Sequence, residues 1–229
     1  MRQNFPQLQS LNVWCLCILA LAGCKENATR YGLIIGDSHA ATPGGWADQL
    51  HELRPQDSLF NLAVSGNTIG FDNLGKKELN TLRNIYYQLA RADNVLPRID
   101  YIVILIGTND CKAIFDSLQS RVPENLDKLV SVVRNYNFIG NSLPDIVLVT
   151  PPPVAEDEQM EEKYAGARRR LQNLLPHFER IAARYGCRYL DIHTQLQPDF
   201  ASLTPDGIHL TTDGYDLIAH MIAEKLDEQ

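Results

Sequence analysis

The sequence predicts an α/β protein in which helices cover both faces of a parallel β-sheet. Three observations support this fold class. Five short apolar segments alternate along the chain with longer segments that carry a helical apolar periodicity. The short segments are apolar throughout rather than at every second residue, which is typical of strands buried on both faces. The 229 residues are enough for one domain with a substantial core.

The predicted strands are rich in β-branched residues and are bounded by Gly, Pro, Asn or Asp, as strands usually are. They comprise residues 31–35, 58–64, 100–106, 145–150 and 187–192. Because a helical segment separates each strand from the next, the strands are expected to be parallel, with right-handed connections.

The predicted helices are amphipathic and comprise residues 45–54, 76–96, 124–136, 158–185 and 211–226. The fourth helix has acidic residues near its start and Arg residues further along, an arrangement that suits the helix dipole. Pro176 lies inside this segment and is expected to kink or break the helix. The basic run 168–170 is expected to form a solvated helix face.

The composition is that of a soluble globular protein, with 45% hydrophobic and 21% charged residues. The formal net charge is −7 and the isoelectric point is near 5.3. Nucleic acid is therefore not an expected partner, because phosphate binding requires a basic surface.

The N-terminus carries a short apolar run at residues 11–23, followed by Cys24. A membrane-spanning helix needs about 20 apolar residues, whereas the apolar region of a secretory signal needs only about 7–15. The residues Ala22-Gly23-Cys24 resemble the lipobox of bacterial lipoproteins. This resemblance implies a signal peptide at residues 1–23, a lipid-modified Cys24, a short tether at residues 24–29 and one folded domain at residues 30–229.

The expected location is therefore the bacterial cell envelope, on its periplasmic or surface face, with the lipid on Cys24 as the membrane anchor. The alternative is an ordinary signal peptide that releases a soluble secreted or periplasmic protein. Removal of the signal would leave Cys111 and Cys187 as the remaining unmodified cysteines. They lie at opposite ends of their predicted strands, roughly 17 Å apart, which exceeds the Cα spacing of about 7 Å that a disulfide tolerates. Two free thiols are predicted.

Unusual polar residues follow the predicted strands at the point where each strand ends. Because the carboxyl ends of parallel strands share one edge of the sheet, these residues are expected to lie close together. They are Gly36-Asp37-Ser38, Ser65-Gly66-Asn67, Gly107-Thr108-Asn109-Asp110 and, in the loop after the fifth strand, Asp206 and His209.

Catalysis by a serine nucleophile requires a base, a carboxylate that orients the base and donors for the developing oxyanion. Ser38 could supply the nucleophile, His209 the base and Asp206 the orienting carboxylate. Gly66 could bring a main-chain N–H close to the substrate, and Asn109 could add an amide donor. Each short segment alone is an ordinary turn or helix cap, so the prediction depends on their conjunction.

The segments "GDS", "NLAVSGN", "GTND" and "DGIHLT" resemble, in order and spacing, the four sequence blocks of the SGNH, or GDSL-type, hydrolases. This resemblance implies a flavodoxin-like three-layer α/β/α sandwich whose five-stranded parallel sheet has the order 2-1-3-4-5. It also implies that Ser38, Asp206 and His209 form a catalytic triad, and that the oxyanion hole comprises the N–H groups of Ser38 and Gly66 and the side chain of Asn109. Two positions depart from the family, His39 in place of Leu and Ala63 in place of Gly.

The function expected from this resemblance is that of a serine ester hydrolase that works through an acyl-enzyme. Short acyl groups, such as O-acetyl esters of carbohydrates or aryl esters, are the expected substrates. A lysophospholipase or thioesterase acting on longer chains is an alternative, and so is an envelope lipoprotein that binds without catalysis.

No cofactor is expected, because nucleotide-binding glycine motifs are absent. No metal is expected either, because the His, Cys and Asp residues lack metal-ligand spacing. His51, His177 and His220 are expected near the surface of helices. The roles of His39 and His193 and the oligomeric state remain open at this point.

Overall fold

The computed structural model describes residues 28–139 and 143–228, together with Met1. Apart from Met1, the predicted signal peptide lies outside these residues, as do Cys24 and most of the predicted tether. Within the described residues, no helix is both long enough and apolar enough to cross a membrane.

The core of the fold is a five-stranded sheet with the order β2-β1-β3-β4-β5. All four neighbouring pairs are parallel. The strands are β1 (Tyr31–Gly36), β2 (Ser58–Asn61), β3 (Tyr101–Leu105), β4 (Asp145–Val149) and β5 (Arg188–Leu190). The predicted fold class and strand order are confirmed, and β2 and β5 are shorter than predicted.

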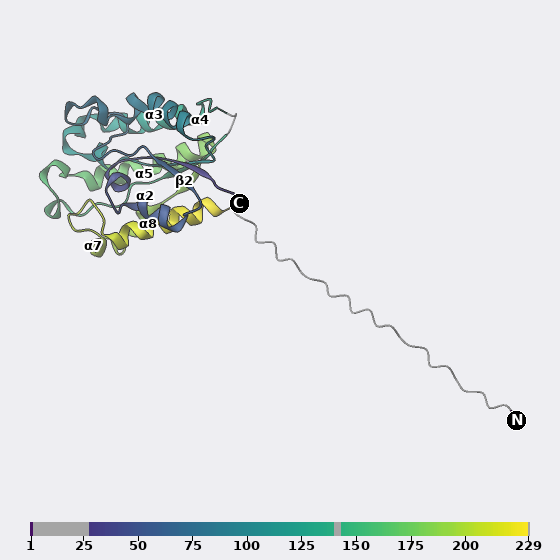
Figure 1. Cartoon of the computed structure of the whole chain (residues 1–229). Coiled ribbons are helices and arrows are strands. Elements are labelled where there is room, and N and C mark those ends of the chain that lie inside the picture. Colours follow the sequence, from purple (N-terminus) through teal and green to yellow (C-terminus); the bar gives the residue numbers. More distant parts are fainter. Residues whose placement is uncertain (2–27, 140–142, 229) are drawn as a thin grey trace.

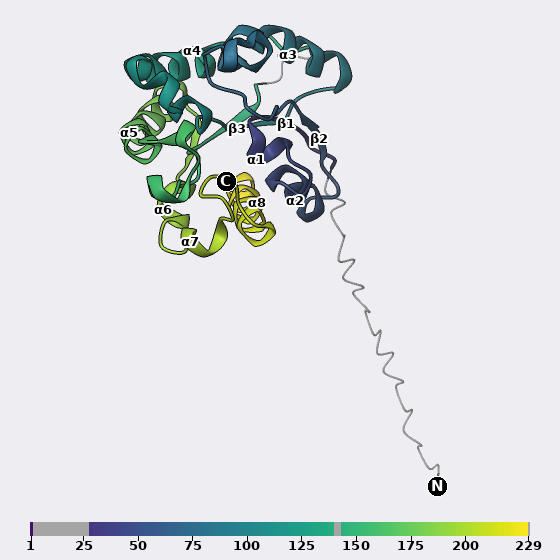
Figure 2. The same ribbon diagram turned by 90° about the vertical axis from the view of Figure 1, so that its left-hand side faces the viewer.

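Five longer helices cover the two faces of the sheet (Figures 1 and 2). They are α2 (Trp46–Leu53), α3 (Thr81–Val95), α4 (Val122–Arg134), α5 (Ala167–Tyr185) and α8 (Thr212–Asp227). Helices α3, α4 and α5 lie on one face, whereas α2 and α8 lie side by side on the other. The sheet therefore forms the middle layer of a three-layer sandwich.

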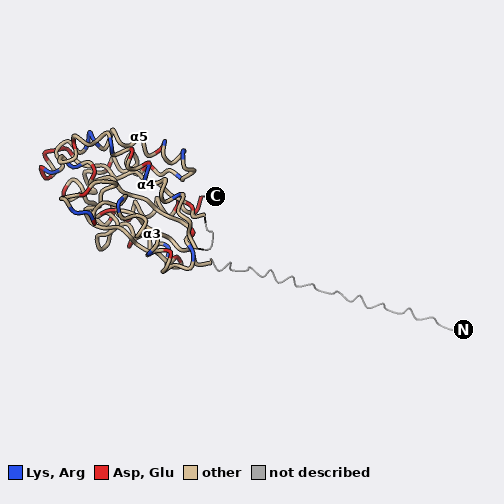
Figure 3. Tube along the Cα trace, turned by 90° about the horizontal axis from the view of Figure 1, so that it is seen from above, with Lys and Arg blue, Asp and Glu red and all other residues tan. Residues whose placement is uncertain are grey.

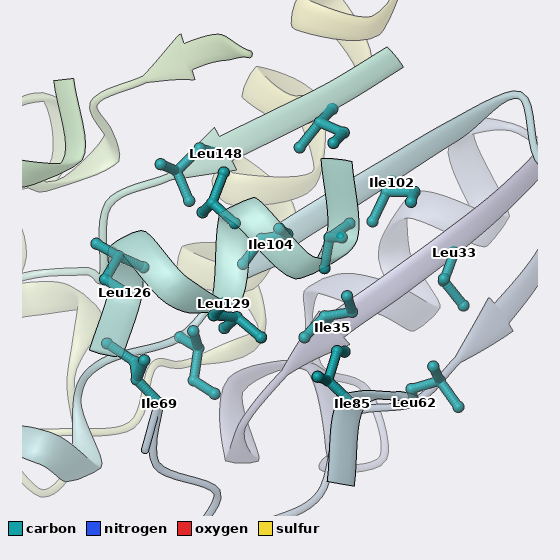
Figure 4. Close-up of a cluster of buried hydrophobic side chains, with 14 of the residues drawn as sticks. Leu33, Ile35, Leu62, Ile69, Ile85, Ile102, Ile104, Leu126, Leu129 and Leu148 are labelled. Atoms are coloured by element: carbon teal, nitrogen blue, oxygen red, sulfur yellow. The ribbon is translucent and has the colours of Figure 1, made fainter. Parts of the chain in front are cut away.

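Alternate residues of the central strands supply the two cores. Ile102 and Ile104 of β3 pack under α3 and α4 with Leu126 and Leu129 (Figure 4). Val103, between the two isoleucines, points to the opposite face and joins the second core with residues of α2 and α8. This alternation follows from the pleat of a strand, and it explains why the strands are apolar at every position.

Short helices occupy several connections. The α-helical turns are α1 (Ser38–Ala41), α6 (Ile192–Leu196) and α7 (Phe200–Leu203). The 3₁₀ turns are η1 (Asn73–Gly75), η2 (Lys77–Leu79), η3 (Asn109–Cys111), η4 (Ala113–Arg121), η5 (Asp157–Gln159) and η6 (Glu162–Tyr164). Three of them, η2, η5 and η6, overlap segments that were predicted as parts of longer helices. Helix α3 accordingly begins at Thr81 rather than near residue 76.

The predicted start of the fourth helix is wrong. Helix α5 begins at Ala167 rather than near residue 158, and its first turn has no acidic residue. Pro176 lies inside α5 without ending it. Both Pro176 and Gln172, whose carbonyl loses its helical partner, lie on the exposed side of the helix. Water can therefore satisfy the freed carbonyl.

The prediction of a solvated basic face holds for Arg169 and is wrong for Arg170. Arg170 is only 6% exposed. Its guanidinium donates to the carbonyl of Cys111 at 2.8 Å and to the Asp116 carboxylate at 2.8 Å. Periodicity could not reveal this role, because both acceptors belong to a distant connection. Basic and acidic residues are interspersed along the described chain (Figure 3).

The prediction of two free thiols is confirmed, since Cys111 and Cys187 are both unpaired. Cys111 follows β3 and is buried, whereas Cys187 precedes β5. Burial raises the pKa of both thiols above the ordinary value.

Shortening Ile104 tests the importance of the core beneath α3 and α4. Ile104→Ala should lower the free energy of unfolding by about 2–5 kcal/mol, because the residue is fully buried and a cavity would remain. Ile114→Ala is the matched control, since Ile114 is 65% exposed, and its effect should stay within about 0.5 kcal/mol. Urea unfolding curves of the two variants compare these effects. Equal destabilisation would contradict the assignment of Ile104 to the core.

Candidate active site

Ser38 is placed by the tight turn that follows β1. Asp37 caps the four-residue helix α1, and its carboxylate accepts a hydrogen bond from the His39 N–H at 3.1 Å. Gly36 fits closely before this turn, because a Cβ at this position would approach the Leu105 carbonyl oxygen to 3.0 Å. Ser38 is therefore the first helical residue, and its side chain remains partly exposed at the carboxyl edge of the sheet.

His209 approaches Ser38 from the loop between α7 and α8. Its Nε2 lies 3.1 Å from the Ser38 Oγ, and its Nδ1 lies 2.7 Å from the Asp206 Oδ2. Since a carboxylate only accepts hydrogen bonds, the imidazole proton belongs on Nδ1. Nε2 is then free to accept the hydroxyl proton of Ser38. The structure thus brings together the three residues of the predicted triad.

Asp206 is held in its orientation by main-chain donors as well as by His209. Its Oδ1 accepts from the N–H groups of Ile208 at 2.9 Å and His209 at 2.7 Å. Partial burial acts to raise the pKa of Asp206, but the hydrogen bonds from the His209 ring and from these N–H groups outweigh it, so that the pKa lies below its ordinary value. Asp206 is therefore ionised and can stabilise a positively charged imidazole.

Gly207 allows this loop to pack against the segment that follows β4. Its φ is +80°, and a Cβ there would lie 2.8 Å from Met160 and 2.9 Å from Ala155. The Ala155 N–H donates to the Gly207 carbonyl at 2.9 Å. The connection between β4 and α5 therefore supports the Asp206–His209 loop from behind.

Gly66 and Asn109 lie in adjoining loops beside the Ser38 turn. The Asn67 side chain donates to the Gly36 carbonyl at 3.1 Å, and the Asn109 Nδ2 donates to the Asn67 carbonyl at 3.0 Å. Gly66 has a φ of +88°, and its carbonyl accepts from the Asn73 side chain at 2.7 Å. The loops after β2 and β3 are thus tied to the end of β1.

The N–H groups of Ser38 and Gly66 donate no hydrogen bond to other residues within the described part of the chain. Together with the second N–H of the Asn109 amide, they are three donors that could bind a negatively charged oxygen. Gly66 and Asn109 therefore lie in loops that are hydrogen-bonded to one another and to the end of β1, from which Ser38 follows.

Two residues beside the site, Tyr164 and Asp110, were given no catalytic role from the sequence. The Tyr164 hydroxyl donates to the Asn109 Oδ1 at 3.3 Å. The Asp110 carboxylate accepts from the Ile69 N–H at 2.8 Å and so joins the loops after β2 and β3. The "GTND" block could have pointed to Asp110, whereas no local pattern marks Tyr164.

Two carboxyl groups, those of Asp37 and Asp110, are completely buried beneath the site. Burial raises the pKa of Asp37 to about 7, although the hydrogen bond from His39 acts against this shift. Burial likewise raises the pKa of Asp110 to about 8. The nearby Lys112 is also buried, and its pKa is lowered for the same reason.

The two histidines of open role occupy different places. His39 is fully buried, with its ring centroid 5.8 Å from that of His209 and its Nδ1 3.4 Å from the Tyr215 hydroxyl. Burial lowers the pKa of His39 to about 3, so the ring is neutral at ordinary pH. His193 lies in α6, where its main-chain N–H donates to Thr150 at 3.1 Å.

As predicted, His51 and His220 lie on the surface, while His177 is partly buried. Within residues 28–139 and 143–228, no group of three or more His, Cys, Asp or Glu side chains is arranged to bind a metal ion. The arrangement of Ser38, His209 and Asp206 can activate a hydroxyl for attack on a carbonyl carbon.

Replacing Asp110 tests the effect of the buried carboxyls on stability. The pKa of Asp110 rises from 3.8 to about 8 on folding, so the folded protein binds more protons than the unfolded chain between these values. Stability should therefore fall as the pH rises through this range. Asp110→Asn cannot ionise and should make the melting temperature less dependent on pH between 5 and 8. Calorimetry would compare it with Asp213→Asn, an exposed control; parallel curves for Asp110→Asn and the wild type would refute the prediction.

Comparisons with known proteins bear on the family and the fold. The model of the GDSL-like lipase/acylhydrolase family matches residues 31–217. The comparison with curated proteins finds no relative.

Three solved structures illustrate the fold similarity. The carbohydrate acetylesterase Est24 from Sinorhizobium meliloti is 22% identical, with a TM-score of 0.70, and the match covers 86% of this chain and 98% of that one. The inhibitor-bound M. smegmatis aryl esterase is 21% identical, with a TM-score of 0.70 and the same coverage. The lipase/acylhydrolase from Enterococcus faecalis is 19% identical, with a TM-score of 0.64, and the match covers 86% of this chain and 95% of that one.

At these identities the solved structures establish the common fold, and the family match, which spans most of the chain, establishes the relationship. The protein is a carboxylic ester hydrolase and belongs to the GDSL-like lipase/acylhydrolase family.

Proposed function

We propose that the chain is a serine ester hydrolase that acts through a covalent acyl-enzyme at Ser38. One observation carries this proposal. The Ser38 hydroxyl lies 3.1 Å from one nitrogen of His209, and the other nitrogen lies 2.7 Å from Asp206. This arrangement is that of a nucleophile, a base and an orienting carboxylate.

In the first half of the reaction, Ser38 Oγ attacks the carbonyl carbon of the ester while its proton passes to His209 Nε2. Asp206 stabilises the positively charged imidazole. The N–H groups of Ser38 and Gly66 and the Asn109 amide would bind the oxyanion. When the C–O bond of the ester breaks, His209 returns the proton to the departing alcohol, which leaves an acyl group on Ser38.

In the second half, water attacks the acyl group and gives its proton to His209. The acid then departs, and the Ser38 hydroxyl regains its proton. Each oxyanion donor of this kind contributes about 10²–10³ to kcat in serine hydrolases, so the three donors would supply a large part of the rate enhancement.

We propose short acyl esters as the substrates, such as O-acetylated carbohydrates or aryl esters. Two proteins of the same fold support this choice, one named a carbohydrate acetylesterase and the other an aryl esterase. A lysophospholipase or thioesterase would instead prefer long acyl chains, which gives a direct way to distinguish the two classes.

We further propose that Cys24 anchors the enzyme to an envelope membrane. Arg30, near the start of the described domain, donates to the Leu226 carbonyl at 3.2 Å and lies over the Tyr101 ring at the start of β3. Ser38 lies at the opposite edge of the sheet. A tether of six residues extends at most about 20 Å, so the anchor would be attached at the edge away from the site. This placement favours substrates outside the anchoring membrane.

Replacing Ser38 tests the proposed reaction. Ser38→Ala should lower the kcat for p-nitrophenyl acetate by at least about 10³-fold, because loss of the nucleophile leaves only binding and oxyanion stabilisation. Ser120→Ala is the control, since Ser120 is exposed in η4. The wild type should also hydrolyse the acetate faster than the decanoate. Activity that survives in Ser38→Ala would rule out the mechanism, and a preference for decanoate would favour the long-chain class.

Replacing Cys24 tests the anchor. Cys24→Ser should abolish incorporation of labelled palmitate into the chain, because the thiol that receives the lipid is gone. Cys17→Ser is the control, since Cys17 lies within the apolar run that the signal peptidase would remove. Mass spectrometry of the mature N-terminus provides the second measurement. Equal palmitate incorporation in the Cys24→Ser variant and the wild type would exclude Cys24 as the acylated residue.

A further inference from the structure

Tyr164 belongs to the segment between β4 and α5 and contacts Asn109 of the proposed oxyanion hole. It ends the 3₁₀ turn η6 and is 6% exposed. Its hydroxyl lies 3.3 Å from the Asn109 Oδ1. No other residue between β4 and α5 makes a side-chain hydrogen bond to Asn109 within the described part of the chain. Tyr164 therefore reaches the site through a single polar contact.

The chemistry of an amide makes this contact directional. The Asn109 Oδ1 can only accept a hydrogen bond, so the Tyr164 hydroxyl must donate. At the other end of the amide, Nδ2 donates to the Asn67 carbonyl at 3.0 Å. If the amide rotated by half a turn, its oxygen would face the Asn67 carbonyl and its nitrogen would face the phenol. The Asn67 carbonyl, which can only accept, therefore selects the observed orientation, and the Tyr164 hydroxyl donates to the amide oxygen in that orientation. One N–H of Asn109 is left for the substrate oxygen.

The Tyr164 ring is held firmly enough to serve this purpose. The ammonium groups of Lys112 and Lys163 each lie 5.5 Å from the ring centroid, at cation–π distance. The ring packs in a buried cluster that also includes Cys111, Val154, Ala167, Leu171 and Ile208. Ile208 precedes His209 in the chain, so the same cluster supports both sides of the site. Burial raises the pKa of the phenol, which therefore keeps its proton at ordinary pH.

We propose that Tyr164 is a positioning residue of the oxyanion hole, which orients the Asn109 amide so that its free N–H points at the developing negative charge. This inference rests on the proposed serine esterase mechanism. Tyr164 itself touches no reacting atom, and its effect on the rate passes through Asn109.

The test is Tyr164→Phe in the full-length chain, which removes one oxygen atom and retains the ring. With p-nitrophenyl acetate, kcat and kcat/KM should fall together by about tenfold, the usual worth of one hydrogen bond, while KM stays unchanged. The loss should appear in both constants because the oxyanion forms only in the transition state. Tyr101→Phe is the control. It also removes a buried hydroxyl, which donates to Asp57 at 2.9 Å at the other edge of the sheet, and it should leave kcat unchanged.

A double-mutant cycle with Asn109→Ala separates positioning from general destabilisation. If Tyr164 acts through Asn109, Tyr164→Phe should cause no further loss of kcat in the Asn109→Ala background. A kcat equal to that of the wild type in Tyr164→Phe would overturn the proposal, as would a tenfold loss that persists in the Asn109→Ala background. Neither result would affect the proposed mechanism, which depends on the separate comparison of the wild type with Ser38→Ala.

Discussion

The parallel register of β1 and β3 is the constraint on which the site depends. Gly36 pairs with Leu105, so the two central strands end at the same level. Ser38 lies two residues beyond the first strand end, and Asn109 lies four residues beyond the second. Gly36 also allows the two strands to pair closely here, because a Cβ at this position would lie 3.0 Å from the Leu105 carbonyl oxygen. Backbone hydrogen bonding of the sheet thus sets the separation between the nucleophile and the oxyanion donors before any side chain interacts.

The site is assembled at a cost in desolvation. Asp37 and Asp110 are fully buried, and the ammonium group of Lys112, which lies over the Tyr164 ring, makes no hydrogen bond or ion pair within the described residues. Burial of ionisable groups opposes folding unless hydrogen bonds compensate. Asp110 receives such a bond from the loop after β2, and Asp37 receives one from the start of α1. These carboxyls therefore hold together the loops that carry Gly66, Asn109 and Ser38. The folded protein is less stable when both carboxyls are ionised.

The connection between β4 and α5 has a larger role than its sequence indicates. Residues 158–166 were predicted as the start of a helix, because acidic residues precede a basic, amphipathic stretch. In the structure, Ala155 bonds to the loop of Asp206 and His209, and Tyr164 bonds to Asn109. The segment is thus not a continuous helix, and it contacts both the loop of Asp206 and His209 and the loop of Asn109. Arg170 at the start of α5 fixes the other end, through the carbonyl of Cys111.

The sequence by itself determined the fold class, the approximate strand positions and the residues that meet at the carboxyl edge of the sheet. These features follow from local patterns, because apolar runs, turn residues and a short motif are each contained within a few consecutive positions. The tertiary structure alone decided the burial of Arg170, the uninterrupted course of α5 through Pro176 and the contact of Tyr164 with Asn109. Tyr164 and Asn109 are 55 positions apart, and no local pattern of one residue specifies the partner that folding places beside it.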